Sequence, residues 1–233
     1  MKTASRLAGA VGGDREERKP VYKRVATQII ADMEKPMQPA DVPESHAADF
    51  GLDIKLLVSQ MTNELDDRRH PALPAGKMGT RFAAEEFFRS MGAQFKYGGD
   101  WPYYNAEEDV IYFPIAKSSR PEEGRLTAKA RELIHWTGHK SRLGRDYGGS
   151  KYGTEGHSRE RLTGEFGAAF LCALLEITPG PRKVHAANIA GWLRAVTTDR
   201  HAALWLAVKD AEIAVDYLYF LRKHIVLMNS SKS

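Results

Sequence analysis

Apolar residues recur at helical spacing along most of the chain. Every fourth residue from Val21 to Met33 is apolar, which predicts a first helix. The segment Pro36-Met-Gln-Pro39 follows, and it should end this helix because proline breaks helical hydrogen bonding. Further helices are predicted over 50–65, from Thr80 to about Met91, and over 126–138, 158–177, 184–197 and 199–228. The chain is therefore expected to be predominantly helical.

Three short segments between the helices at 80–91 and 126–138 have the composition of strands. They are rich in aromatic and β-branched residues and comprise Ala93–Tyr97, Trp101–Tyr104 and Asp109–Ile115. Turn-forming residues separate them, Gly98-Gly99-Asp100 in one case and Asn105-Ala-Glu-Glu108 in the other. The pattern predicts an α+β fold, predominantly α, with a small antiparallel sheet packed on the helix at 126–138.

Length and composition indicate one core. A chain of 233 residues with 42% hydrophobic content can bury a single core of good size. We expect a flexible arm over 1–20, a helix and linker over 21–48, and a compact domain over 49–229. The one cysteine, Cys172, lies in an apolar run and is expected to be a buried packing residue. Without a signal peptide or a long apolar segment, the chain is predicted to be cytoplasmic and not bound to membranes.

The positive charge is concentrated at the start of the chain. Residues 1–24 hold seven Lys or Arg against three acids, which equals the net charge of +4 of the whole chain. A basic segment of this kind is either a solvated tail or a contact for nucleic-acid phosphates, and both interpretations stay open. The candidate phosphate contacts are Lys2, Arg6, Arg15, Arg18, Lys19, Lys23 and Arg24.

Candidate metal chemistry lies in the segment Arg131-Glu-Leu-Ile-His-Trp-Thr-Gly-His139. A zinc peptidase helix reads H-E-x-x-H, so that both histidines bind one metal and the glutamate holds the attacking water. Glu132 and His135 occupy the last two of these positions, which makes Glu132 the candidate general base. Arg131 replaces the first histidine, and a guanidinium stays protonated and offers no lone pair. His135 and the nearby His139 remain as candidate ligands.

The residues around this segment resemble one known family. The stretches Leu133-Ile-His-Trp-Thr-Gly-His-Lys-Ser-Arg-Leu143 and Glu165-Phe-Gly-Ala-Ala-Phe-Leu171 are similar to the zincin-like metallopeptidase domain of ArdC-type antirestriction proteins. The likeness extends over about 80–220, including Ala186–Leu193 and Ala214–Leu218. Residues 21–30 resemble the opening helix of that family's single-stranded-DNA-binding domain, the rest of which is not recognisable. The resemblance implies a zincin-like fold, a plasmid-, phage- or element-borne protein, and protection of incoming DNA from host restriction.

The third metal ligand of the family lies on the following helix, and two registers fit. In one register the ligand position falls on Arg161, and in the other it falls on Glu165. The first register would mean that two ligand positions, at 131 and 161, have become arginine. We therefore expect no cofactor or weakly bound zinc. Arg131 beside Glu132 and Glu165 would instead form a metal-free cluster of ion pairs.

The leading hypothesis is an antirestriction-type protein with a degenerate, inactive peptidase domain and weak binding of single-stranded DNA. One alternative is an active zinc peptidase that uses Glu132 as the base, with His135, Glu165 and His139 on the metal. Another is an inactive module that binds a host or mobile-element protein. Tyr103 and Tyr104 are expected to pack within the sheet. The histidines at 185, 201 and 224 are expected to lie on the surface or in the core.

Overall fold

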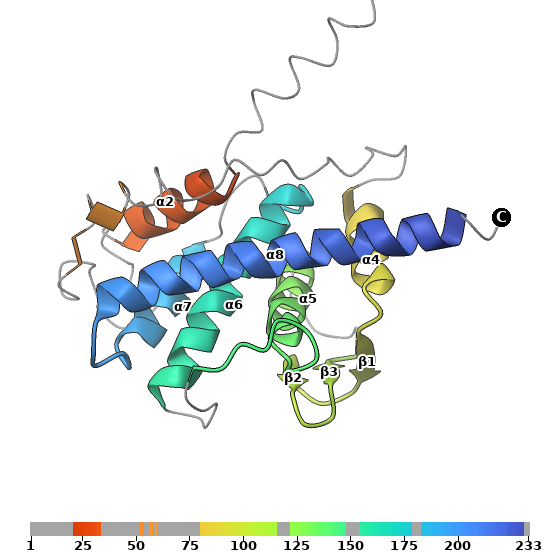
Figure 1. Cartoon of the computed structure of the whole chain (residues 1–233), viewed down its shortest axis with the longest axis horizontal. Helices are drawn as coiled ribbons and strands as arrows, with labels where there is room; N and C mark the ends of the chain where they lie inside the picture. Colours follow the sequence, from red (N-terminus) through yellow and green to blue (C-terminus); the bar gives the residue numbers. More distant parts are fainter. Residues whose placement is uncertain are drawn as a thin grey trace, which may run out of the picture.

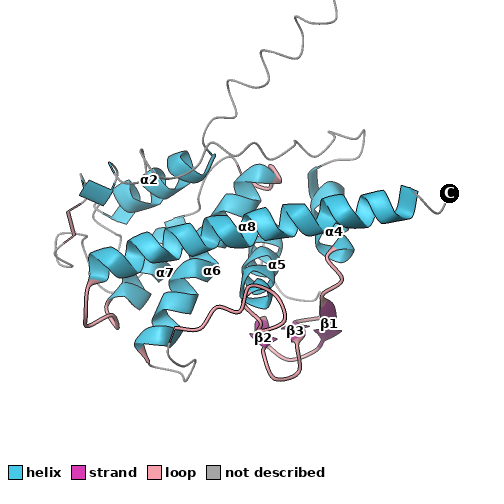
Figure 2. Cartoon of the chain, in the orientation of Figure 1, coloured by secondary structure: helices cyan, strands magenta, loops and turns pink. Residues whose placement is uncertain are grey.

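The computed structural model describes residues 21–33, 52–53, 56–57, 59, 80–115, 122–147, 154–178 and 183–230. Its main elements are helices α2 (Val21–Met33), α4 (Thr80–Ser90), α5 (Glu122–Thr137), α6 (Glu155–Leu174), α7 (Lys183–Leu193) and α8 (Arg200–Ser230), and strands β1 (Gln94–Tyr97), β2 (Tyr103–Asn105) and β3 (Val110–Phe113). Figures 1 and 2 show a mostly helical molecule with the small sheet beside one end of α5. The predicted α+β class with predominant helix is therefore confirmed.

Helix α6 forms the centre of the core. It packs against α5, α7 and α8, and the side chains of Phe166 and Phe170 on it are fully buried. A Cβ atom added at Gly167 would lie 2.8 Å from the side chain of Ile134 on α5. Because glycine has no side chain, α5 and α6 approach closely at this point. This close approach brings the segment with the metal-site motif against α6.

Helix α2 is joined to the rest of the core through its apolar face. Tyr22 stacks against Phe170 of α6 with ring centroids 4.9 Å apart, and its hydroxyl donates to Asp216 of α8 at 3.0 Å. Val25 and Ile29 are fully buried on the same face. The repeat of apolar residues every fourth position thus marks the buried side of this helix, as expected from the sequence.

The sheet is mixed, which corrects the predicted antiparallel arrangement. Its strand order is β1-β3-β2, with β3 parallel to β1 and antiparallel to β2. The chain reverses after β1, at Gly98 and Gly99, and again before β3, where Asp109 has a φ of 56°. After two reversals β3 runs in the direction of β1, and it pairs with β1 because it lies in the middle of the sheet. Local sequence patterns do not encode this strand order.

Helix boundaries differ from the predicted ones by a few residues. Helix α6 begins earlier than expected because the Thr154 side chain caps it by accepting a hydrogen bond from the His157 backbone N–H at 3.2 Å. Helix α5 ends at Thr137, and the Leu143 backbone N–H donates to the free Thr137 carbonyl at 3.0 Å. Cys172 is buried, as predicted. The expected arm at 1–20 and most of the linker and of the helix at 50–65 lie outside the described residues.

In the part of the chain that the structure describes, no helix is both long enough and apolar enough to cross a membrane.

Candidate functional site

The residues of the predicted metal site come together where α5 packs against α6, which also packs against α7. Arg131 lies between two carboxylates. Its Nε lies 3.2 Å from Glu132 Oε1, and its Nη1 lies 3.1 Å from Glu165 Oε1. The carboxylate side chains are 1% and 4% exposed, whereas that of Arg131 is 23% exposed. The site residues predicted at 131, 132 and 165 thus form one ion-pair cluster.

Glu165 is held from a second side by α7. His185 Nδ1 lies 2.9 Å from Glu165 Oε2, and Asn188 donates to Oε1 at 2.9 Å. Burial raises the pKa of Glu165, but the hydrogen bonds and charges of His185, Arg131 and Asn188 outweigh this effect and lower it. Sequence reasoning placed His185 on the surface or in the core without assigning it to the site. The sequence feature that could have assigned His185 to the site is its position directly before the family-like segment Ala186–Leu193.

For the Arg131 guanidinium, burial by itself lowers the pKa, and the negative charges of Glu165 and Glu132 raise it by more. The net result is a raised pKa. Arg131 therefore stays a cation at this position, and the cluster depends on its charge.

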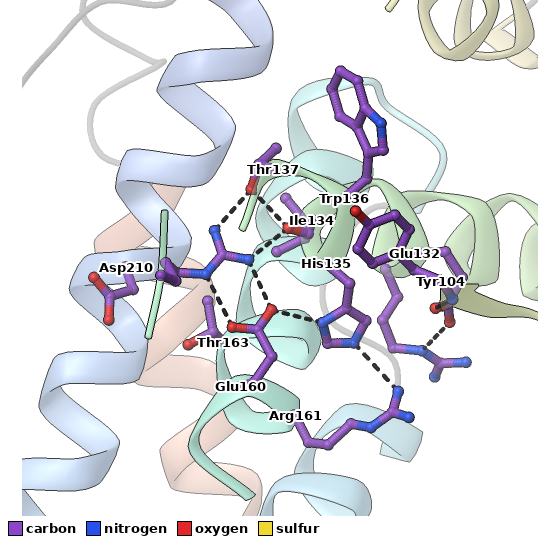
Figure 3. Close-up of polar contacts among 12 residues, drawn as sticks. Tyr104, Glu132, Ile134, His135, Trp136, Thr137, Glu160, Arg161, Thr163 and Asp210 are labelled. Carbon is purple, nitrogen blue, oxygen red and sulfur yellow. Dashed lines mark hydrogen bonds and ion pairs between the residues drawn. The ribbon is translucent and has the colours of Figure 1, made fainter. Parts of the chain in front are cut away.

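Both oxygens of Glu132, the candidate general base, are occupied. Oε1 faces Arg131, and Oε2 accepts a hydrogen bond from the Tyr104 backbone N–H of β2 at 3.0 Å. Figure 3 labels Glu132 and Tyr104, which lie side by side at this point. The Tyr104 hydroxyl donates to Asp109 at 2.8 Å and accepts from Arg142 at 3.2 Å, so the tyrosine is fixed by its neighbours. A carboxylate held in this way is poorly placed to activate water.

His135 is held at both ring nitrogens. Nδ1 lies 2.9 Å from Glu160 Oε1, and Nε2 lies 3.4 Å from Arg161 Nη1 (Figure 3). A guanidinium can only donate, so Nε2 is the acceptor and Nδ1 carries the proton given to Glu160. A Cβ atom at Gly164 would overlap the imidazole, so glycine is required for the ring to lie there. The lone pair that would bind a metal therefore points at Arg161.

Glu160 anchors His135 to the loop after α5. Arg145 approaches Glu160 with Nε at 3.0 Å and Nη2 at 2.8 Å, and it also donates to Thr137 Oγ1 and to the Ile134 carbonyl. Burial raises the pKa of Glu160, but the hydrogen bonds from His135 and Arg145 outweigh it and lower the pKa to about 2. Sequence reasoning assigned no role to Glu160 or Arg145, since only tertiary packing places this loop beside α6.

The structure does not assemble the ligand set His135, Glu165 and His139. His139 Nδ1 lies 2.7 Å from Ser141 Oγ in the loop after α5. Across the described ranges, no three His, Cys, Asp or Glu side chains are arranged to hold a metal ion. Arg131 occupies the position of the first motif histidine, and Arg161 faces His135 Nε2 at 3.4 Å, so the donor set does not fit a zincin metal site.

The predicted phosphate contacts at 2, 6, 15, 18 and 19 lie outside the described residues. Lys23 and Arg24 lie on α2, where Arg24 is exposed and Lys23 is partly buried. Among the described residues, the hydrogen bonds and ion pairs of the cluster on α5 and α6 involve neither of them. Contact with nucleic acid therefore stays a prediction from charge.

Comparison with known proteins identifies relatives of this domain. The pattern of the zincin-like metallopeptidase family (MPTase-PolyVal) matches residues 82–209, more than half of the chain. An uncharacterized protein, y4eC, of Sinorhizobium fredii is 33% identical over 144 residues, covering 62% of this chain and 46% of the relative. The DNA primase TraC of Escherichia coli is 35% identical over 144 residues, covering 61% of this chain and 13% of the primase. The chain thus spans less than half of the length of these relatives.

Solved structures of the antirestriction protein ArdC from the R388 plasmid share the fold. The Mn(II)-bound form is 29% identical with a TM-score of 0.51, covering 69% of this chain and 58% of ArdC. The metal-free form is 28% identical with a TM-score of 0.50, covering 69% of this chain and 56% of ArdC. The family match over residues 82–209 includes α5, α6 and α7, which carry the cluster around Arg131. The chain belongs to the zincin-like metallopeptidase family and resembles ArdC antirestriction proteins in sequence and fold.

Proposed function

We propose that this chain is an antirestriction-type protein that acts by binding, in which a metal-free ion-pair cluster replaces the peptidase centre. The likeness to ArdC supports the antirestriction part of this proposal. The loss of peptidase chemistry rests on one observation, the guanidinium of Arg161 that faces His135 Nε2 at 3.4 Å. The atom that would bind a metal accepts a hydrogen bond from Arg161 there instead.

Electrostatics supports the loss of the metal. A guanidinium about 4 Å from a divalent ion repels it by roughly 8 kcal/mol at an effective dielectric constant of about 20. Structural zinc binding contributes about 10–16 kcal/mol in total, and replacing a histidine also removes a bond to the metal. Arg131 and Arg161 together therefore offset most of what a zincin site could provide. An active peptidase would need both guanidinium groups to leave the cluster.

The test is the transfer of unmodified plasmid DNA into a restricting host that expresses the protein. We expect the protein to raise the number of transformants, and the variant Glu132→Gln to retain this effect within about twofold. In an active peptidase, loss of the general base costs about 100-fold or more. Glutamine keeps the shape of Glu132 and still accepts from Tyr104.

The control variant for this experiment is Glu86→Gln, which removes an exposed carboxylate on α4. A non-restricting host corrects for differences in DNA uptake. Loss of protection in Glu132→Gln alone, with normal protein levels, would show that the cluster has a hydrolytic role and would refute the binding mechanism.

We also propose weak, sequence-tolerant contact of the basic N-terminal segment with single-stranded DNA, which the charge excess in residues 1–24 favours. Each neutralised phosphate of a single strand contributes about −0.7 to the log–log salt slope of binding. The full chain should therefore lose affinity steeply with salt, and a chain that begins at Val21 should have a slope smaller by up to about 3.5. Equal slopes in a fluorescence titration with oligo(dT) would show that these residues do not contact DNA.

A further inference from the structure

Arg161 differs from the other arginines around the cluster in its partners. Arg131 lies 3.1 Å from Glu165, Arg145 lies 2.8 Å from Glu160, and Arg142 pairs with Asp109. Within the described part of the chain, Arg161 contacts no carboxylate. Its Nε donates to His157 Nε2 at 3.4 Å, and its Nη1 faces His135 Nε2 at the same distance. Arg161 therefore carries a positive charge for which the described residues provide no counter-ion.

The surroundings of Arg161 withdraw it partly from water. The side chain is partly buried, and its guanidinium carbon lies 5.9 Å from the centre of the Trp192 ring. His157 packs edge-on against the same ring at 5.3 Å. Burial lowers the pKa of His157, and the charge of Arg161 lowers it further. These residues form a site of positive potential with one aromatic wall, and a charge in such a place favours an anionic partner.

The guanidinium retains the donors needed to bind an oxyanion. Of the five N–H groups of an arginine, Nε–H and one on Nη1 are directed at the two imidazoles, which leaves the other Nη1 hydrogen and both on Nη2. A carboxylate can accept hydrogen bonds from these remaining donors.

The charges nearby favour a single carboxylate over a nucleic-acid backbone. Arg161 supplies one uncompensated positive charge, which a monoanion neutralises. The adjacent cluster has two buried carboxylates, Glu132 and Glu165, on either side of Arg131. A chain of phosphates would bring further negative charges towards them, and each would be repelled.

We propose that Arg161 binds one carboxylate of a polypeptide ligand, either a C-terminal group or an acidic side chain, against Trp192. This inference rests on the proposed metal-free cluster, since a metal at His135 would displace Arg161. The cleft would then recognise an anionic group of a protein partner without cleaving it.

The experiment is an NMR titration of the full chain, following the Trp192 indole and the imidazoles of His135 and His157. The probes are N-acetyl-trialanine with a free carboxylate, the same peptide with an amidated C-terminus, amidated N-acetyl-Ala-Glu-Ala, and a dT oligonucleotide. We expect at least one carboxylate peptide to shift these resonances and the amidated trialanine to leave them unchanged. Comparison of the trialanine peptide that has a free C-terminus with the amidated Ala-Glu-Ala peptide shows whether the site prefers a C-terminal or a side-chain carboxylate. Equal shifts with amidated trialanine, no shifts with any peptide, or stronger binding of the oligonucleotide at these resonances would overturn the proposal.

Variants connect the response to Arg161. Arg161→Gln should weaken carboxylate binding at least tenfold, and Arg161→Lys should weaken it less, because it keeps the charge but loses the paired donors. The matched control is Arg89→Gln, which removes the same charge from an exposed position on α4 and should change nothing. Arg161→Gln should melt close to the original protein, because Arg161 forms no ion pair with any described residue. Unchanged binding in a folded Arg161→Gln variant contradicts the assignment.

Titrations with and without EDTA separate this inference from the proposed function. Carboxylate binding that persists in EDTA and requires Arg161 supports both the proposed metal-free function and the assignment of Arg161 as the carboxylate site. Binding that disappears with EDTA would show that a metal holds the ligand, which contradicts both. A metal-free protein that binds no carboxylate contradicts only the assignment of Arg161.

Discussion

A chain carrying Arg131→His together with Arg161→Glu should bind zinc at least about 1,000-fold more tightly than the original chain. The two substitutions remove two guanidinium groups from the surroundings of His135, and Arg131→His restores the H-E-x-x-H sequence. Each group repels a divalent ion by roughly 8 kcal/mol at close range, and solvent screening reduces this value for partly exposed side chains. A net gain of about 4 kcal/mol already corresponds to three orders of magnitude in affinity. The measurement is isothermal titration calorimetry with zinc and with manganese, in competition with a chelator.

The single variant Arg131→His should gain less, because Arg161 still faces the Nε2 atom of His135. The control is Arg89→His, which adds a histidine at an exposed site on α4. If the double variant folds and binds zinc no better than this control, the positions at 131 and 161 are not the former ligand positions. The alternative register, with the ligand at Glu165, would then be favoured.

Removing the Arg131 guanidinium should destabilise the fold. In Arg131→Met, the buried carboxylates of Glu132 and Glu165 lose the cation between them. Breaking a fully buried pair costs about 3–5 kcal/mol, and the partial exposure of Arg131 places the expected loss at the lower end of this range. The measurement is urea denaturation at pH 7. Replacing Lys96 by Met, in an exposed pair with Glu108, should have almost no effect.

The pH dependence of this loss follows from the carboxylates. The pKa of Glu165 is lowered in the folded chain, so its contribution to stability is present above the unfolded pKa and is lost as the pH falls. The deficit of Arg131→Met should therefore persist from pH 7 to about pH 5 and shrink as the pH falls further, through the lowered pKa of Glu165, where this carboxylate becomes protonated. Adding Glu165→Gln to Arg131→Met should recover part of the lost stability at pH 7. A deficit that is small at pH 7 or independent of pH would show that the cluster does not depend on charge.

Much of the fold could be predicted from the sequence because the helices bury one face each. The apolar repeat of α2 marks the side on which Val25 and Ile29 are buried. The sheet was the exception, since β3 enters between two strands that precede it in the chain. Strand order is a tertiary property, and short strands joined by similar turns do not specify it.

The site was predictable where its residues share one helix. Arg131, Glu132 and His135 lie on α5 at a spacing that places them at one cleft, and the sequence alone indicates it. His185 and Glu160 could not be assigned in this way. Each contacts the cluster only because α6, α7 and the loop after α5 pack together, and isolated acids or histidines on helices are common without such a role.

Direct measurement of bound metal tests the replacement of the metal centre by ion pairs. The original chain is purified without chelator from cells supplied with zinc and manganese, and its metal content is determined by mass spectrometry. We predict well under one metal ion per chain and an unchanged melting temperature after addition of EDTA. The reason is that Arg131 pairs with Glu165, and Arg161 contacts His135, without a metal. One tightly held ion per chain, together with a large fall in melting temperature on chelation, would contradict the metal-free cluster.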